Sequence, residues 1–187
     1  MKNVFIGGTI RSGKSTLSKR IYHELNYSIL ELDTIVHSFT KVFPELGINE
    51  KDPKDIDKNF APFAYEVLNC CDKDRKYSDI KVCINGFQLQ PGTIANFKKV
   101  DNMIVIYLGI SDATPHQLLN KIRETEVDGD WTKDKSDESL LQICTNIINT
   151  SKDIKNQCEI FGFKYFDTFL DREGTFDNII EYLRINN

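Results

Sequence analysis

Close to its N-terminus the chain reads Gly8-Thr9-Ile10-Arg11-Ser12-Gly13-Lys14-Ser15, which has the spacing G-x-x-x-x-G-K-[ST]. A short apolar run at 4–6 precedes this octapeptide, and a segment with helical periodicity follows it. A strand, a glycine-rich loop and a helix in this order are typical of a phosphate-binding loop. The alternative is an ordinary glycine-rich turn, which would not require the complete eight-residue pattern.

The octapeptide has the chemistry of a polyphosphate site. Gly8 and Gly13 can adopt backbone angles closed to other residues, so consecutive N–H groups can turn toward phosphate oxygens. The helix that begins near Lys14 directs its positive dipole end at the same anion. Lys14 adds a mobile cation, and the Ser15 hydroxyl can ligate Mg2+. We therefore expect ligand contacts from Gly8, Arg11, Ser12, Gly13, Lys14, Ser15 and Thr16, with Ser15 as the metal ligand.

The composition is that of an ordinary globular protein. The 187 residues suit one domain covering 1–187, and 40% hydrophobic with 28% charged residues allow a buried core. A net charge of -4, without a basic cluster, argues against nucleic acid binding. No apolar run is long enough to span a membrane, and the opening segment is too short for a signal peptide. Five cysteines without a C-x-x-C pair indicate reduced thiols, so we expect a cytoplasmic protein.

Apolar runs predict five strands, at 4–6, 27–32, 82–84, 103–108 and 163–166. Helical periodicity lies between these runs, and Leu17, Ile21 and Leu25 mark the inner face of the first helix. Strands that alternate with helices predict an α/β fold with a parallel sheet and right-handed crossovers. We expect N-terminal helix caps at Thr34, Asn59, Thr114 and Thr175, and a helix end at Gly162.

The longest interval between expected strands is 34–79. It contains an expected helix to residue 43, a loop at 44–57 and an amphipathic helix that begins after Asn59. Its four phenylalanines could form an aromatic substrate pocket, but their helical spacing favours a place in the core; they are Phe39, Phe43, Phe60 and Phe63.

A second interval, 124–139, is too rich in charge to be core. It contains Asp128-Gly129-Asp130 and the single tryptophan, Trp131. Composition alone favours a solvated surface loop. Its position directly after Arg123 suggests a second hypothesis, that the interval is a mobile lid.

The polar residues at the predicted strand ends complete a recognisable layout. The phosphate loop follows the first strand, Asp33 ends the second, and Asn85-Gly86 ends the third. Arg123 ends the helix after the fourth strand, and the charged interval precedes the fifth. This layout resembles the small P-loop kinases, the group of adenylate-, shikimate- and gluconate-type kinases.

The resemblance implies a three-layer P-loop NTPase fold, with a five-stranded parallel sheet in the order 2-3-1-4-5 and helices on both faces. It implies ATP and Mg2+ as cofactors, residues 34–79 as the acceptor-binding segment and residues 124–139 as the lid. Ligands in such open sheets bind at the carboxyl ends of the strands.

The resemblance also assigns roles to single residues. Lys14 would bind the outer phosphates, and Asp33 would orient or deprotonate the acceptor hydroxyl. Arg123 would close on the transferring phosphoryl group. For Asp33 and Arg123 the alternative is a charge that complements a helix terminus.

One position departs from the pattern. Kinases of this kind often carry a carboxylate at the end of the third strand, near the metal, whereas Asn85 supplies no negative charge. Either Asp33 covers the metal role, or the segment with Asn85, Gly86 and Gln88 contacts the acceptor.

We conclude that the sequence favours an ATP-dependent phosphotransferase that acts on a hydroxyl of a small molecule. A GTP switch is disfavoured, because no N-K-x-D tetrapeptide occurs in the chain. A nucleoside monophosphate kinase remains an alternative, although Arg75 is the only arginine in 34–79. A non-catalytic ATP-binding regulator is the other alternative. The acceptor and the oligomeric state are not predicted.

Overall fold

The computed structural model describes residues 2–49, 52 and 55–186. Five strands form one sheet in the order β2-β3-β1-β4-β5, and every neighbouring pair is parallel. This confirms the expected α/β class and strand order. The strands are β1 (Asn3–Gly8), β2 (Ser28–Glu31), β3 (Val82–Asn85), β4 (Met103–Gly109) and β5 (Lys164–Asp167).

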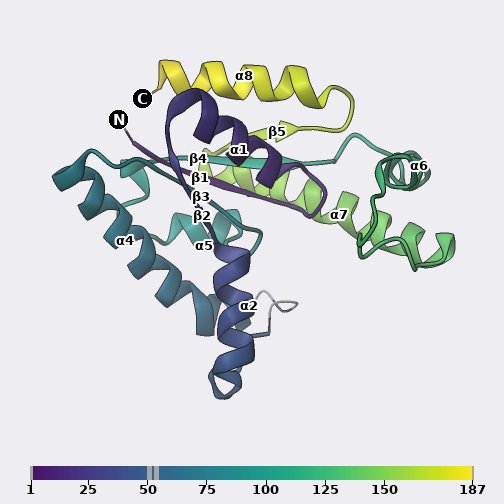
Figure 1. Ribbon diagram of the computed structural model, residues 1–187, viewed down its shortest axis with the longest axis horizontal. Helices are drawn as coiled ribbons and strands as arrows, with labels where there is room; N and C mark the ends of the chain where they lie inside the picture. The colour runs from purple at the N-terminus through teal and green to yellow at the C-terminus, as the bar shows by residue number, and fades with distance from the viewer. Residues whose placement is uncertain (1, 50–51, 53–54, 187) are drawn as a thin grey trace.

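Helices cover both faces of the sheet (Figure 1). One face carries α1 (Lys14–Leu25) and α8 (Arg172–Ile185), and the other carries α4 (Ala61–Ser78), α5 (Pro91–Ala95) and α7 (Asp137–Phe161). Side chains of β1 alternate between the two cores, because successive residues of a strand point to opposite faces. Val4 and Ile6 belong to the core beneath α1 and α8, whereas Phe5 belongs to the core with α4 and α7. A strand that is buried on both faces is apolar along most of its length, as β1 is at Val4, Phe5 and Ile6.

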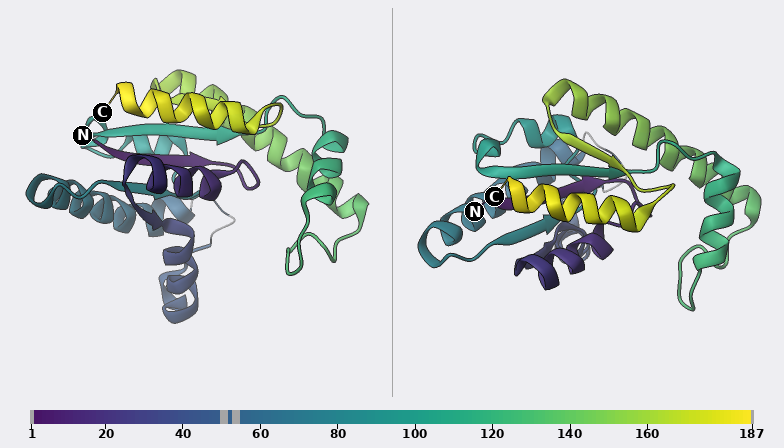
Figure 2. Two further views of the ribbon diagram at one scale, coloured as in Figure 1. Left: turned by 45° about the horizontal axis from the view of Figure 1, so that its top comes forward. Right: turned by 90° about the horizontal axis from the view of Figure 1, so that it is seen from above.

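A third core lies beyond the edge of the sheet. It joins α6 (Pro115–Thr125) to the first half of α7 through apolar side chains that include Leu118, Ile122, Leu140, Cys144 and Ile147. Figure 2 shows the connection between these two helices at one end of the molecule. The predicted lid segment, 124–139, therefore includes the last residues of α6 and the first turn of α7.

Two helix boundaries lie where the sequence predicts them. Thr114 caps α6, accepting a hydrogen bond from the Gln117 backbone N, and the Gln117 side chain bonds back to the Thr114 N–H. Gly162 ends α7 with a φ of 74°, in the left-handed region.

Three predicted caps are wrong. α2 (Leu32–Val42) follows β2 directly, so Thr34 lies inside the helix rather than before it. Asp171 caps α8, because its carboxylate accepts a hydrogen bond from the Gly174 backbone N at 2.9 Å, and Thr175 lies inside the helix. Asn59 lies in a π-helical turn, η2 (Ile56–Phe60), that leads into α4; its amide donates to the Gly47 carbonyl oxygen at 3.0 Å.

The aromatic cluster of the 34–79 interval is only partly core. Phe60 is buried, but 46% of Phe43 and 39% of Phe63 remain exposed. The rings of Phe39 and Phe63 meet edge to face with centroids 4.7 Å apart. The core prediction is thus right for Phe60 and wrong for Phe43 and Phe63.

Two short 3-10 turns complete the described structure, η1 (Pro44–Leu46) after α2 and η3 (Val100–Asn102) before β4. None of the described helices has both the length and the apolar character needed to cross a bilayer.

Candidate functional site

The octapeptide forms a loop between β1 and α1. Gly8 and Gly13 have φ values of 131° and 92°, the conformations that their predicted role requires. Arg11 also lies in the left-handed region, with a φ of 64°, which is uncommon for a residue with a side chain. The Thr9 backbone N donates to the Leu108 carbonyl oxygen of β4, so the loop is anchored to the central strands.

Lys14 closes the loop from inside. Its ammonium donates to the carbonyl oxygens of Gly8 at 3.1 Å and Thr9 at 2.7 Å. Burial lowers the pKa of Lys14 to about 8, and the negative charge of Asp33 offsets part of this effect. The hydrogen-bond partners of this buried ammonium are neutral carbonyl oxygens, so a bound anion would stabilise its positive charge.

Residues far along the chain brace the loop. The Thr168 hydroxyl donates to the Ser12 carbonyl oxygen at 2.9 Å, and Arg172 donates to the Arg11 carbonyl oxygen at 3.0 Å. Thr168 and Arg172 were not identified from the sequence. Each follows the last strand, and no local pattern shows that its side chain bonds to a loop far away in the sequence. Ser15 and Thr16, in the first turn of α1, are exposed.

Asp33 lies in the first turn of α2 rather than at a strand end. One of its oxygens, Oδ1, is buried and has no hydrogen-bond partner among the described residues. Gln88 is 2% exposed, and neither its Oε1 nor its Nε2 has a described partner. A Cβ added to Gly86 would lie 2.6 Å from Gln88 Oε1 and 3.4 Å from Asp33 Oδ1. The structure thus brings Asp33, Gly86 and Gln88 together.

Asn85 is engaged elsewhere. Its amide nitrogen donates to the Ser18 hydroxyl of α1 at 2.9 Å, and Ser18 donates in turn to the Lys14 carbonyl oxygen. Asn85 is buried, and this hydrogen bond links β3 to α1.

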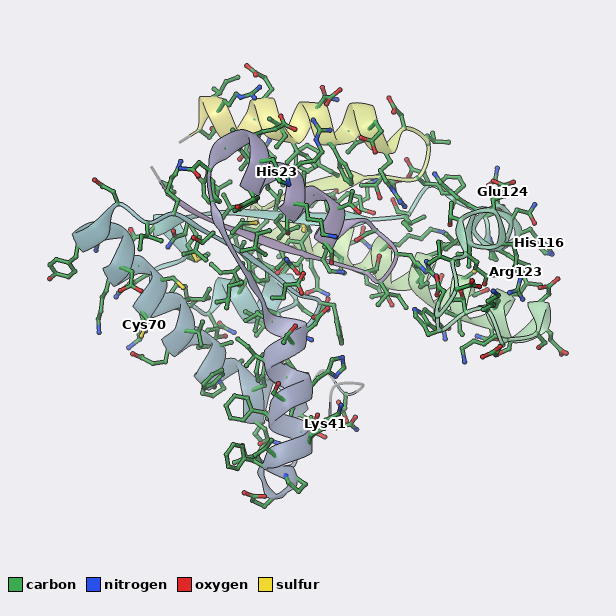
Figure 3. All side chains as sticks on the ribbon, viewed as in Figure 1. His23, Lys41, Cys70, His116, Arg123 and Glu124 are labelled. Carbon is green, nitrogen blue, oxygen red and sulfur yellow. The ribbon has the colours of Figure 1, made fainter. Side chains whose placement is uncertain are left out.

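Arg123 ties the ends of the lid segment together. Its guanidinium donates to Asp137 at 2.7 Å, to Glu126 at 2.9 Å and to the Lys135 carbonyl oxygen at 2.6 Å. Within the described part of the chain, its hydrogen-bond partners all lie in residues 126–137. Figure 3 places Arg123 beside Glu124 and His116 at the α6 end of the molecule.

The contact between the phosphate loop and the lid segment comes from Arg11. Its Nη2 lies 2.6 Å from each carboxylate oxygen of Asp130 and 2.9 Å from the Thr132 hydroxyl. The Arg11 guanidinium also lies over the Trp131 ring, 5.7 Å from its centroid. Hydrogen bonds from Arg11 and Thr132 lower the pKa of Asp130, which keeps the pair charged.

Two cavities open beside the loop. The main cavity, of about 840 Å³, has Ile10, His37, Ile56, Phe87, Gln88 and Trp131 in its lining. A side chamber of about 290 Å³ continues from it toward α7 and shares Ile10 and Phe87. Among the described residues no cluster of three His, Cys, Asp or Glu side chains could hold a metal.

Comparisons with known proteins agree with this geometry at the level of the fold. No family model matches the chain. A search of curated protein sequences finds no significant match either. The solved structure of a shikimate kinase from Bacteroides thetaiotaomicron aligns over 98% of both chains, with a TM-score of 0.60 and 16% sequence identity.

Two further kinases align over the whole chain. A gluconokinase from Sinorhizobium meliloti matches with a TM-score of 0.55 and 14% identity over 97% of its own chain. A shikimate kinase from Acinetobacter baumannii, solved with shikimate, matches with a TM-score of 0.54 and 15% identity over 95% of its chain. The protein therefore has the fold of the small P-loop kinases.

Proposed function

We propose that this protein is an ATP- and Mg2+-dependent kinase that transfers the γ-phosphoryl group to a hydroxyl of a small molecule. The observation that carries the proposal is the buried Lys14 of the phosphate loop, on which the Asp33 charge acts by raising the pKa of the ammonium. A cation suited to phosphate and a carboxylate with a buried, unpartnered oxygen lie within electrostatic reach of each other, beside a large cavity. In a phosphoryl transfer the cation would bind the phosphates of the donor, and the carboxylate would accept the proton of the acceptor hydroxyl.

In this proposal the loop holds the nucleotide. Lys14 exchanges the carbonyl oxygens of Gly8 and Thr9 for the β- and γ-phosphate oxygens, and the loop N–H groups contact the same phosphates. The exposed Ser15 hydroxyl is suited to ligate Mg2+, and Thr16 reaches the α-phosphate. When bound, Mg2+ neutralises phosphate charge. Arg11 supplies a second cation, and Arg123 remains a prediction for a closed state of the lid segment.

Asp33 is the proposed catalytic base. Its free oxygen accepts the proton of the acceptor hydroxyl while the hydroxyl oxygen bonds to the γ-phosphorus. The bond from the γ-phosphorus to the β–γ bridging oxygen breaks, and ADP leaves with that electron pair. Gly86 permits this close approach, because a side chain there would occupy the space between Asp33 and Gln88.

A non-catalytic ATP-binding regulator is the second candidate. The observation in its favour is Asn85, which bonds to Ser18 and leaves no carboxylate at the end of β3. A nucleoside monophosphate kinase is less well supported, because no described arginine lines the main cavity or the side chamber.

A coupled ADP-release assay tests the proposal. Wild-type protein, Lys14→Ala and Asp33→Asn would be screened with Mg-ATP against sugars, sugar acids, nucleosides, nucleotides and cofactor precursors. We expect acceptor-dependent ADP release from the wild type alone. ATP binding without ADP release for any acceptor would support the regulator instead, and failure to bind ATP would refute both.

A further inference from the structure

Gln88 is an unusual side chain for the wall of a cavity. It lines the main cavity, yet only 2% of its surface is exposed, and both of its polar atoms lack a described partner. A buried carboxamide without hydrogen bonds destabilises the ligand-free protein. A ligand that offers one donor to Oε1 and one acceptor to Nε2 would remove that cost.

The described walls of the two cavities favour an uncharged ligand group. Among the described residues that line the main cavity and the side chamber there is no Lys, Arg, Asp or Glu. Phosphate and carboxylate groups bind where cations or several N–H donors converge. Among the described residues of these walls, only Gly8, Thr9 and Ile10 of the phosphate loop offer such N–H groups, and the proposed nucleotide uses them.

The side chamber adds a requirement for apolar surface. Ile143, Ile147 and Ile154 of α7 line it together with Ile10 and Phe87. Asn146 and Thr150 are the polar residues that α7 contributes. At about 290 Å³ it can hold a ring or a short hydrocarbon group, but not a second large ligand.

We propose that the acceptor is an uncharged alcohol with a planar amide or amidine group and an apolar arm. Gln88 pairs with the amide or amidine edge, the arm fills the side chamber, and the hydroxyl is directed to Asp33. The role of this ligand as a phosphoryl acceptor rests on the proposed kinase function. Its binding at this site can be tested without turnover.

Three small probes separate these features. 3-Hydroxy-3-phenylpropanamide has the hydroxyl, a primary amide whose N–H and C=O share one edge, and the apolar arm; 1-phenylethanol lacks the amide, and 3-hydroxypropanamide lacks the arm. Binding would be followed by saturation-transfer NMR and by isothermal titration on the full chain, with cytidine as a larger amidine alcohol. We expect 3-hydroxy-3-phenylpropanamide and cytidine to bind at least about tenfold more tightly than either truncated probe.

Gln88→Leu provides the decisive variant. If Gln88 serves a ligand, the variant loses about tenfold or more in affinity for the amide probe, while its Tm in the absence of ligand rises by about 2–4 °C. If Gln88 is purely structural, the variant should have a lower Tm and an unchanged affinity for the amide probe. Gln157→Leu is the matched control, because Gln157 already accepts a hydrogen bond from the Gly92 backbone N; its Tm should fall with probe binding unchanged.

The outcomes separate this inference from the kinase proposal. Equal binding of the amide probe by wild type and Gln88→Leu, or no saturable binding of either amide or amidine alcohol, would overturn the inference. ADP release confined to charged acceptors would overturn it as well and leave the kinase intact. Probe binding that depends on Gln88, without ATP binding, would support the site and refute the kinase.

Discussion

Arg11 of the phosphate loop and Asp130 of the lid segment form an ion pair in which Nη2 lies 2.6 Å from both carboxylate oxygens. The two residues are separated by 119 positions in the sequence, so the pair docks the middle of the lid segment onto the loop. The Asp130 carboxylate binds the Arg11 guanidinium, which could otherwise bind a phosphate group. Nucleotide binding and this contact are therefore expected to compete for Arg11.

Asp130→Asn tests that competition. The variant keeps the shape of the side chain but removes its charge, which frees Arg11 for phosphate oxygens. We expect Mg-ATP to bind about twofold to fivefold more tightly, the range for a partly exposed ion pair. Titration calorimetry at low and high salt would measure it. Asp134→Asn removes an exposed charge from the same segment and serves as the control; equal affinities for all three proteins would contradict the competition.

The pKa of Lys14 predicts a pH dependence of stability. Its folded-state pKa of about 8 lies below the ordinary value of 10.5, so between these values the unfolded chain binds more protons than the folded protein. The contribution of Lys14 to stability is therefore constant below pH 8 and rises with pH up to about 10.5, by about 3 kcal/mol in total. Urea unfolding of wild type and Lys14→Met across pH 7–10.5 would isolate this term as their difference, and a constant difference would contradict it.

Asp33→Asn separates the catalytic from the metal role of this residue. As a general base, Asp33 contributes about 10²–10⁴ to kcat, and its amide variant should bind Mg-ATP normally. Single-turnover rates and calorimetric affinities would be compared once an acceptor is found. A collapse of Mg-ATP affinity with intact acceptor binding would instead place Asp33 in the metal shell.

Gly86→Ala tests the close approach on the acceptor side. The new Cβ would lie 2.6 Å from Gln88 Oε1 and 2.9 Å from Leu32 Cβ, so these side chains must shift. We expect a stability loss of about 1–3 kcal/mol and a larger loss of acceptor-dependent turnover, with ATP binding retained. Unchanged turnover would show that the space beside Asp33 is not used.

Local features were predictable and long-range partners were not. The phosphate loop and the caps at Thr114 and Gly162 depend on a few consecutive residues, and the structure has them where the sequence predicts. The engagement of Asn85 with Ser18, and that of Arg11 with Asp130, depend on residues brought together only by the fold. Asp33 illustrates the difference, since a carboxylate at the end of the second apolar run was predicted but its position inside α2 was not.

The last prediction concerns motion of the lid segment, and Trp131 is its reporter. Half of this side chain is exposed. The Arg11 guanidinium lies over its ring, and Lys135 Nζ lies 5.8 Å from the ring centroid. If a nucleotide takes Arg11 from Asp130, Trp131 loses or changes its cationic neighbour, and its emission should shift when a non-hydrolysable ATP analogue and Mg2+ are added. An acceptor in the main cavity should enlarge the shift, because Trp131 lines that cavity.

Arg123→Ala should act on the same signal by a different route. Arg123 holds Glu126, Asp137 and two lid carbonyl groups, so its loss should loosen the segment before any ligand binds. We expect higher acrylamide quenching of Trp131 in the free variant and a smaller change on adding the ATP analogue. Arg184→Ala, which removes an exposed arginine on α8, is the control. Constant Trp131 emission in the wild type through saturating ligand, with binding shown by calorimetry, would mean that the lid segment stays docked.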